Sequence, residues 1–269
     1  GGYTNKVNIQ IGNKITQKTD TVEVDTDLFT VTYDPNGGNW SGDTNNQVFT
    51  KLVRDSKTPM VNDPTREGYN FAGWTPEVAA TVTANATYTA QWTPRTDLSY
   101  TVNYWLLGTT VEAQSSKVVP NQTFGTTVTE APAVISGYTY ANSVTPADSI
   151  TIAVTGNEIT YYYYKDLTIA AKSNEWTYTG AAHTEPGFTV TGLVNGDVDT
   201  KFTLSMTADS TITYVGTKDN VIDQGTVKYD NGTIPGYYKV TYENGTLKVN
   251  DNTDIPGDKS HTAGKYRMG

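Results

Sequence analysis

Apolar and polar residues alternate over many short segments of the chain, which is the pattern of half-buried β-strands. These segments are residues 29–33, 87–92, 100–104, 159–164, 238–242 and 246–249. Asn244 and Gly245, between the last two segments, are a favoured turn pair and predict a β-hairpin. Residues 76–84 suggest a helix, and only a short one. The pattern therefore predicts an all-β protein.

The order of the strands and turns repeats. Tyr33 on a first strand is followed by a glycine-tyrosine element at Gly68, and Tyr104 is followed at similar spacing by Gly137. A third series of strands fills residues 167–249. Internal repeats of this size predict an array of small domains.

Two short junctions, residues 94–97 and 165–166, separate the three series of strands. We therefore expect three small β domains in an elongated tandem array, with little contact between domains that are not neighbours. The predicted segments are an N-terminal strand or linker (1–26), three domains (27–96, 97–165 and 166–250) and a linker or tail (251–269).

The composition predicts thin cores that depend on aromatic side chains. Apolar residues make up 36% of the chain and aromatic residues 11%. The first value is below the roughly 45–50% of an average globular domain, whereas disordered segments are poor in aromatic residues. Large rings then fill small β cores, so Tyr33, Trp74 and Trp92 are expected in the core of the first domain.

Charge and residue content exclude several kinds of chemistry. The net charge of −9 and the lack of a basic segment argue against a nucleic-acid partner. Without cysteine the chain has neither disulfides nor thiolate metal sites, and two histidines leave little room for a histidine-centred active site. We expect no enzyme activity and no cofactor.

The location is inferred from the same features. No apolar run approaches the roughly 20 residues of a membrane span, and no signal peptide opens the chain. Gly1 in place of an initiator methionine predicts that the chain is an excised part of a longer polypeptide. A large β protein without cysteine fits a bacterial exterior better than a eukaryotic one.

Two polar motifs resemble metal sites only in part. Residues 34–38 suggest a calcium loop, but the carboxylates at the later loop positions are missing, so a turn is the better interpretation. Asn250, Asn252 and Asp254 alternate like cation ligands, yet Pro256 follows and no bidentate glutamate closes the loop. No metal site is predicted.

Two further side-chain groups could carry chemistry. His183 and Glu185 could form an acid–base pair, but a surface loop is the favoured interpretation because Pro186 follows. Lys228, Lys239 and Asn250 raise the alternative of a lysine–asparagine amide bond. Solvent-facing lysine is favoured over such a bond, since lysine is seldom buried.

Specific motifs in the first series resemble a known family. They are Asp34, Pro35, Gly37 and Gly38 in a turn, then Gly68, Tyr69, Gly73 and Trp74, then Ala90 and Trp92. In this order they resemble the Listeria–Bacteroides repeat, also called the internalin B repeat. This resemblance implies a β-grasp-like module of a bacterial surface protein, and it brings no catalytic motif with it.

The second and third series resemble other modules of bacterial surface proteins. Residues 100–165 are similar to a mucin-binding-protein (MucBP) repeat, through the strand at 100–104 and the tyrosine run at its end. Residues 166–249 resemble an MBG-type adhesin domain, through residues 178–180, 186–193 and 244–247. Together the resemblances imply a cell-surface or cell-wall location and a host mucin, glycan or matrix protein as partner.

Exposed aromatic side chains are the candidate ligand-binding groups. They are Trp40, Trp105, Tyr161, Tyr162, Tyr163 and Tyr164. Trp40 follows a glycine turn and is expected to be exposed, whereas the tyrosine run must place two rings inward and two outward, because strand side chains alternate. Solvent-facing tyrosines without a ligand are the plainer alternative.

Three functions remain open at this point. The chain is expected to be a non-catalytic adhesive region of a surface protein, acting as a monomer without membrane insertion. The alternatives are a passive spacer that projects a head domain, and an ancillary region of a secreted glycan-degrading enzyme.

Overall fold

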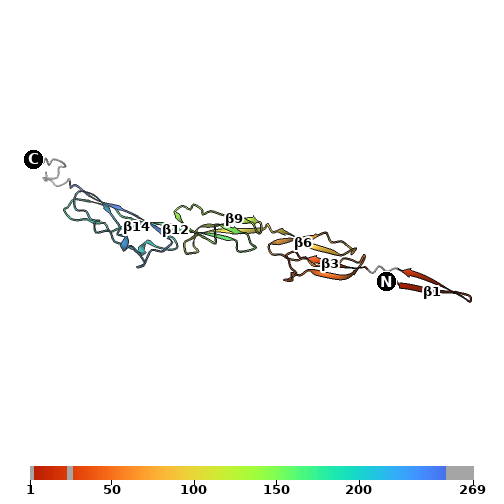
Figure 1. The fold of residues 1–269 in the computed structure, drawn as a ribbon. Coiled ribbons are helices and arrows are strands. Elements are labelled where there is room, and N and C mark those ends of the chain that lie inside the picture. The colour runs from red at the N-terminus through yellow and green to blue at the C-terminus, as the bar shows by residue number, and fades with distance from the viewer. Residues whose placement is uncertain (1–2, 23–26, 253–269) are drawn as a thin grey trace. The chain divides into compact units, whose positions relative to one another are not determined.

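The computed structural model describes residues 3–22 and 27–252, and in these residues β-strands dominate (Figure 1). There are nineteen strands, two short 3-10 helices and no α-helix in the described ranges, which confirms the all-β prediction. The β-grasp likeness stays a prediction. The short helix expected over residues 76–84 is wrong: these residues form bends and a single β-bridge, from Thr81 to Lys57.

The described residues fall into two compact units. Unit 1 lies within residues 1–100, 119–128 and 151–157, and unit 2 within residues 101–118, 129–150 and 158–269. The array of domains expected from the sequence is neither confirmed nor contradicted by this division.

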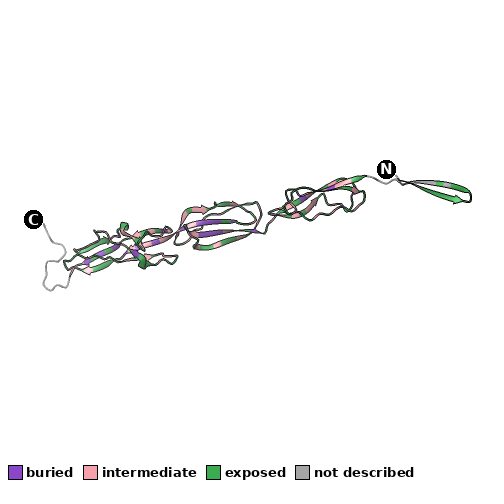
Figure 2. Ribbon diagram, turned by 90° about the horizontal axis from the view of Figure 1, so that it is seen from below, coloured by how far each residue is buried: buried purple, intermediate pink, exposed green. Residues whose placement is uncertain are grey.

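In unit 1 a four-stranded sheet has the order β4-β3-β6-β5. Its strands are β3 (Leu28–Asp34), β4 (Gln47–Val53), β5 (Tyr69–Thr75) and β6 (Ala86–Pro94). β3 and β6 are parallel, and each has an antiparallel partner on its other edge. Unit 1 also contains an antiparallel pair, β1 (Tyr3–Ile11) with β2 (Lys14–Val22), in which residues 6–15 are exposed (Figure 2).

The core of this sheet is aromatic, as the composition predicts. Tyr33 is fully buried and lies beside Trp74, with 4.9 Å between the ring centroids. Trp74 packs against the core from a half-buried position, and Trp92 is half-buried as well. The expectation of a core position is therefore confirmed for Tyr33, whereas Trp74 lies at the edge of the core and Trp92 packs against Phe71.

Trp92 closes the turn that follows β3. Its indole nitrogen donates to the carbonyl oxygens of Pro35 and Asn36, both at 3.1 Å. A Cβ atom added to Gly38 would overlap the Trp92 ring and lie 2.9 Å from the Thr65 carbonyl oxygen. Glycine at position 38 is therefore needed to let the indole lie against the turn.

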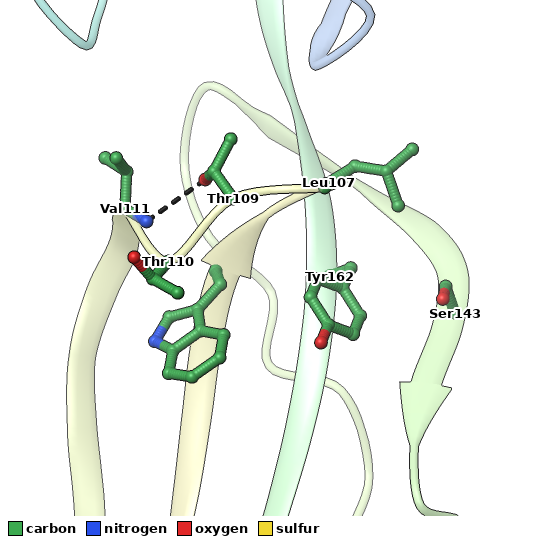
Figure 3. A pocket seen from close by; sticks show the side chains of 8 residues that line it. Leu107, Thr109, Thr110, Val111, Ser143 and Tyr162 are labelled. Atoms are coloured by element: carbon green, nitrogen blue, oxygen red, sulfur yellow. Dashed lines mark hydrogen bonds between the residues drawn. The ribbon is translucent and has the colours of Figure 1, made fainter.

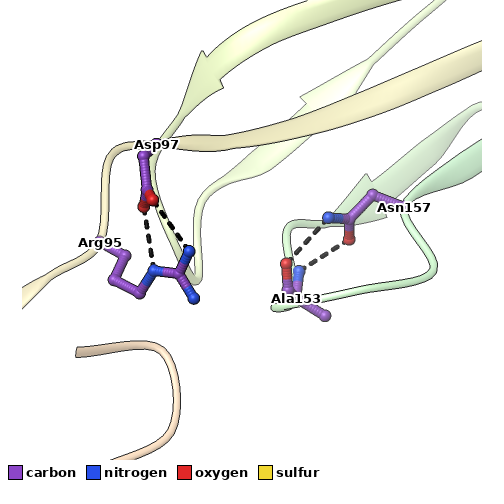
Figure 4. A network of polar contacts seen from close by, with 4 residues as sticks. All are labelled: Arg95, Asp97, Ala153 and Asn157. Atoms are coloured by element: carbon purple, nitrogen blue, oxygen red, sulfur yellow. Dashed lines mark hydrogen bonds and ion pairs between the residues drawn. The ribbon is translucent and has the colours of Figure 1, made fainter.

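The segment after β6 is fixed by polar contacts within unit 1. The Arg95 guanidinium donates two hydrogen bonds to the Asp97 carboxylate, both of 2.9 Å (Figure 4). The Arg95 amide donates to the Gly68 carbonyl at 2.9 Å, and its carbonyl accepts from the Phe124 amide at 2.8 Å. The same view shows Asn157, whose side chain accepts a hydrogen bond from the Ala153 amide and donates one to the Ala153 carbonyl, and so closes a turn.

A second sheet has the same topology. Its strands are β7 (Leu98–Leu106), β8 (Glu112–Gln122), β10 (Tyr138–Thr145) and β12 (Glu158–Ala171), in the order β8-β7-β12-β10. β7 and β12 are parallel, as β3 and β6 are. Two short strands, β9 (Thr127–Thr129) and β11 (Ser149–Thr151), pair with each other. The repeat predicted from the sequence is thus confirmed at the level of strand order.

β12 continues without a break through residues 165 and 166, which the sequence suggests as a junction. Its second half pairs with β14 (Phe188–Thr191) and with β18 (Tyr238–Glu243). The core on this half contains Leu167, Ile169 and Phe202. One strand therefore belongs to both the second and the third series of strands.

The remaining strands of unit 2 form smaller sheets. β13 (Asn174–Thr177), β19 (Gly245–Asn250) and β16 (Gly216–Asn220) form a three-stranded sheet in that order. β15 (Phe202–Thr203) pairs with β17 (Lys228–Tyr229), and the 3-10 helices are Asp199–Lys201 and Gln224–Thr226.

The hairpin predicted at Asn244 and Gly245 is wrong, although both of its strands exist. β18 pairs with β12, and β19 pairs with β13 and β16, so the two strands lie in different sheets. A Cβ atom on Gly245 would overlap the carbonyl oxygen of Lys172. Glycine is present because the chain passes close to the end of β12, not because a two-residue turn needs it.

The contact between Gly38 and Trp92 gives a testable prediction. Gly38→Ala is expected to lower the free energy of unfolding of the first sheet by about 1–3 kcal/mol, because the indole must move away from the turn. Urea unfolding of the full chain, followed by tryptophan fluorescence, measures this change. In a protein that already carries Trp92→Leu, Gly38→Ala is expected to cost less, because leucine leaves room for the added methyl group.

Gly236→Ala is the matched control, because an added Cβ at that position meets no atom within 4 Å. Equal costs for Gly38→Ala with Trp92 and with Leu at position 92 would contradict the proposed contact.

Candidate functional site

The outward face of the second sheet carries a row of paired side chains. In the β7–β12 register Asn103 lies opposite Thr160, and Trp105 lies opposite Tyr162. Positions that lie opposite each other, or two residues apart on one strand, point to the same side of the sheet, so these four side chains share one face. On this face Asn103 and Thr160 are buried, whereas Trp105 and Tyr162 are half-buried. Asn103 donates to the Thr160 hydroxyl at 3.3 Å and accepts from Ser116 at 2.8 Å.

At the end of this row lies an open groove of about 690 Å³ (Figure 3). Trp105 and Tyr162 line it with rings 6.4 Å apart and inclined by 68°. The turn after β7 closes one side, and β10 supplies the other. The further lining residues are Leu107, Gly108, Thr109, Thr110, Val111 and Ser143. We call these eight residues the Trp105 groove.

The turn after β7 is held rigidly by local hydrogen bonds. The Thr109 amide and hydroxyl both donate to the Leu106 carbonyl, at 3.0 and 3.1 Å. The Thr109 hydroxyl in turn accepts from the Val111 amide at 3.0 Å, the bond drawn in Figure 3. These bonds fix the wall of the groove opposite Ser143.

Several polar groups of the groove remain available to a ligand. Within the described residues no hydrogen-bond partner is found for the Trp105 indole nitrogen, the Tyr162 hydroxyl or the Ser143 hydroxyl. The groove therefore combines two half-buried rings with neutral donors and acceptors. No charged residue lines it.

A second, smaller groove lies on the same strand. Tyr164 follows Tyr162 by two positions and therefore points to the same side of β12. The groove measures about 440 Å³, and its other lining residues are Thr139, Tyr140, Ala141, Asn142, Tyr238 and Lys239. β10 is bulged between Tyr140 and Ser143. This irregularity places Asn142 in the second groove and Ser143 in the first.

The tyrosine run is divided as strand periodicity predicts. Tyr161 and Tyr163 are buried, while Tyr162 and Tyr164 are half-buried and line the two grooves. The Tyr163 hydroxyl donates to the Ala133 carbonyl at 2.8 Å. Burial raises the pKa of Tyr163 to about 12, so its ring stays neutral in the core. Tyr161 and Tyr163 are thus core residues rather than ligand contacts.

Trp40 was expected to be exposed, and this expectation is wrong. The side chain is half-buried and packs against the core of the first sheet. Its indole nitrogen donates to the Asn62 carbonyl at 2.7 Å, and its ring stacks on Trp74 with 6.4 Å between centroids. The glycine-rich turn before it suggested exposure, but the contacts of the ring lie far away in the sequence.

The structure assigns structural contacts to the other polar groups considered above. His183 stacks on Trp176 at 4.9 Å, and Glu185 accepts from Asn174 and from the Gly187 amide. These contacts link His183 and Glu185 to different neighbours. No group of three or more histidine, aspartate or glutamate side chains in the described residues could hold a metal ion.

The candidates for an amide bond lie apart in the pairing scheme. Lys228 and Lys239 are exposed on β17 and β18, and neither strand pairs with β19, which carries Asn250. The Asn250 amide instead donates to Glu175, which also binds Lys248 at 2.9 Å. Asp254, the last of the suggested cation ligands, lies outside the described residues, as does His261.

Sequence reasoning missed a cluster of three tyrosines around one carboxylate. The hydroxyl groups of Tyr229, Tyr237 and Tyr238 donate to Asp197 at 2.7, 2.6 and 2.8 Å. Burial alone raises the pKa of Asp197, but the three hydroxyl donors outweigh it and leave the pKa below its usual value. The carboxylate is already bonded by protein groups, so the cluster stabilises the fold and is not a ligand site.

Comparison with known families identifies one part of the chain. Residues 29–99 match the Listeria-Bacteroides repeat domain, which confirms the first of the three resemblances. This repeat is typical of bacterial surface proteins. The MucBP-like and MBG-type resemblances stay predictions. Comparison with the curated proteins gave no match.

The described residues also contain no helix that is long and apolar enough to span a membrane.

The Asp197 cluster gives a prediction about pH. A carboxyl group whose pKa is depressed by folding stabilises the protein above its unfolded pKa of about 3.9, and this stabilisation is lost as the pH falls through the lower folded value. Asp197→Asn is expected to cost about 1.5–3 kcal/mol at pH 7, because hydrogen bonds to a charged group are lost. Urea unfolding at pH 7, 5 and 3 measures the difference from the parent protein.

That difference is expected to shrink as the pH falls below about 4, where the carboxyl group of the unfolded chain becomes protonated, and to be lost below the lower pKa of the folded state. The exposed Asp199, replaced by Asn, serves as the control and is expected to behave like the parent. A cost for Asp197→Asn that is the same at all three pH values would contradict the assignment.

Proposed function

We propose that this chain is a non-catalytic, adhesive region of a bacterial cell-surface protein that binds neutral glycans or glycoproteins of a host surface. The observation that carries the proposal is the Trp105 groove. The match of residues 29–99 to a repeat typical of surface proteins supports the extracellular location.

The groove has the chemistry that a sugar ring requires. A pyranose presents one face of C–H groups, which packs on an aromatic ring, and an edge of hydroxyls, which need donors and acceptors. Trp105 and Tyr162 supply two rings at an angle, and Ser143 and Thr110 supply hydroxyls on either side. A sugar can therefore pack on one ring and reach the other with its edge.

The absence of charge in the groove favours neutral ligands. Neither lysine nor arginine lines it, and the chain as a whole carries a net charge of −9. A sulfated or sialylated chain would meet this field without a compensating cation. The second groove differs, because Lys239 lies in its lining.

The groove is shallow and open, so the affinity for one sugar is expected to be weak, about millimolar. Such sites become effective when several act on one multivalent surface, since linkage raises the effective concentration without new contacts. Arrays of modules and mucin-like ligands would provide that multivalency.

Titration with neutral mucin-type oligosaccharides, followed by tryptophan fluorescence, tests the proposal. We expect a saturable change in the parent and a loss of at least about tenfold in affinity for Trp105→Ala and for Tyr162→Ala, which corresponds to about 1.4 kcal/mol of lost contact. The control is Tyr214→Ala, because Tyr214 is 75% exposed and lies outside both grooves. Circular dichroism confirms that each variant is folded.

Saturable binding that is unaffected by Trp105→Ala and Tyr162→Ala would overturn the assignment to this groove. No binding by the parent, together with no retention on immobilised mucin, would favour the passive spacer or the ancillary region of a secreted enzyme.

A further inference from the structure

In the first two series of strands the first strand lies beside the last, and the two are parallel; in the third series the second half of β12 lies parallel to β18. β3 pairs with β6 over four positions, from Val31 opposite Ala86 to Asp34 opposite Thr89. β7 pairs with β12 over six positions, and the second half of β12 pairs with β18 over six more. We call these three pairs the terminal ladders.

The third ladder extends beyond β18. β13 pairs in parallel with β19 over four positions, from Asn174 opposite Leu247 to Thr177 opposite Asn250. The side-chain contacts in this part also join residues 73 positions apart, the Thr246 amide to Ser173 and Lys248 to Glu175. β12 with β18 keeps the same register, so one pairing continues through both sheets.

Two segments, from β12 to β13 and from β18 to β19, pass from one sheet to the next, and they are closely packed where they do so. The Asn220 side chain, fully buried, donates to the carbonyls of Lys172 and Glu185 at 2.9 and 2.8 Å. Gly245 packs directly on the Lys172 carbonyl. Because Asn220 also lies opposite Gly245 in the β16–β19 register, these contacts connect the end of β12 to the start of β19.

Parallel terminal strands respond to tension in a particular way. When the chain is pulled at its two ends, the start of the first strand and the end of the last strand move in opposite directions along the same line. The hydrogen bonds between them are then loaded side by side and must break nearly together. In an antiparallel hairpin pulled at its open end, the bonds instead break one after another, each at a low force.

We infer that the chain is a tension-bearing element, in which force along the backbone is resisted in shear by the three terminal ladders. The second ladder is covered on both sides. β12 has β7 on one edge and β10 on the other, and the ladder residues Val102, Ile159 and Tyr161 are almost completely buried. The Tyr104 and Tyr161 rings stack across it, 6.4 Å apart.

This function is independent of the glycan groove, because it rests on strand order and register alone. It suits a protein that holds a cell to a surface against flow, whichever module makes the contact. A passive spacer would need only to be folded, whereas a tension-bearing element also needs this directional resistance.

The chain contains no cysteine, so two introduced cysteines define the points of pulling without ambiguity. Thr96→Cys with Lys172→Cys places the handles at the start of β7 and just after β12, and loads the second ladder in shear. Thr96→Cys with Thr155→Cys places both handles at the same end of the ladder, where the Asn157 amide contacts the Ser99 carbonyl at 3.1 Å, and peels the strands apart. All three positions are exposed.

Single-molecule pulling of the full-length chain at one loading rate compares the two geometries. We expect the rupture force in the shear geometry to be at least about twice that in the peeling geometry, since forced unfolding follows the barrier along the direction of pulling. A ratio smaller than this overturns the inference. Urea unfolding of both double variants must give the parent's midpoint, so that the ratio reports direction and not stability.

Glycan titration of the same two variants keeps this result separate from the proposed function. The titration tests only the proposed glycan binding. The force ratio tests the tension-bearing inference, whether or not these variants bind glycan.

Discussion

The structure of unit 2 depends on the need of a central strand to satisfy its backbone groups on both edges. β12 has fourteen residues, and each edge must find hydrogen-bond partners along nearly all of that length. On one edge β7 pairs first and β18 continues: the Tyr163 carbonyl accepts from the Leu107 amide, and the Lys165 amide donates to the Tyr237 carbonyl. On the other edge β10 is followed by β14. Four strands are thus positioned by one.

The same strand separates the core from the proposed binding surface. Because side chains alternate, Tyr161 and Tyr163 fill the interior while Tyr162 and Tyr164 face the grooves. The inward rings pack against Tyr104 and Tyr140 and so hold the backbone of β12 in place. The outward rings are attached to the same backbone, so a ligand of the proposed groove would not have to order this strand when it binds. The proposed adhesive and tension-bearing functions therefore share one structural element.

Local features of this fold could be predicted from the sequence, and long-range pairings could not. Alternation predicted the strands and the division of the tyrosine run, because a period of two is independent of what the strand pairs with. The prediction of a turn at Asn244 and Gly245 was wrong, because the glycine is explained by the close approach of Lys172, which is far away in the sequence. The prediction that Trp40 is exposed was wrong for the same reason, because its partners are Asn62 and Trp74.

The candidate site was predicted in part. Trp105 and Tyr162 were named as ligand contacts, and the register of the parallel strands β7 and β12 places them side by side. Ser143 enters the groove through a bulge in β10, for which the sequence carries no clear signal. The turn containing Thr109 and Thr110 follows Gly108 and a strand, a pattern from which its place beside Trp105 could have been inferred.

Native-state hydrogen exchange of the β12 amides tests most directly whether this strand unites the structure of unit 2. If it does, the amides of Ile159, Tyr161, Leu167 and Ile169 have the same free energy of opening, close to that of global unfolding, because neither half of the strand opens alone. Opening of residues 158–165 at a free energy clearly different from that of residues 166–171 would contradict the account. It would show two domains that merely adjoin within one strand.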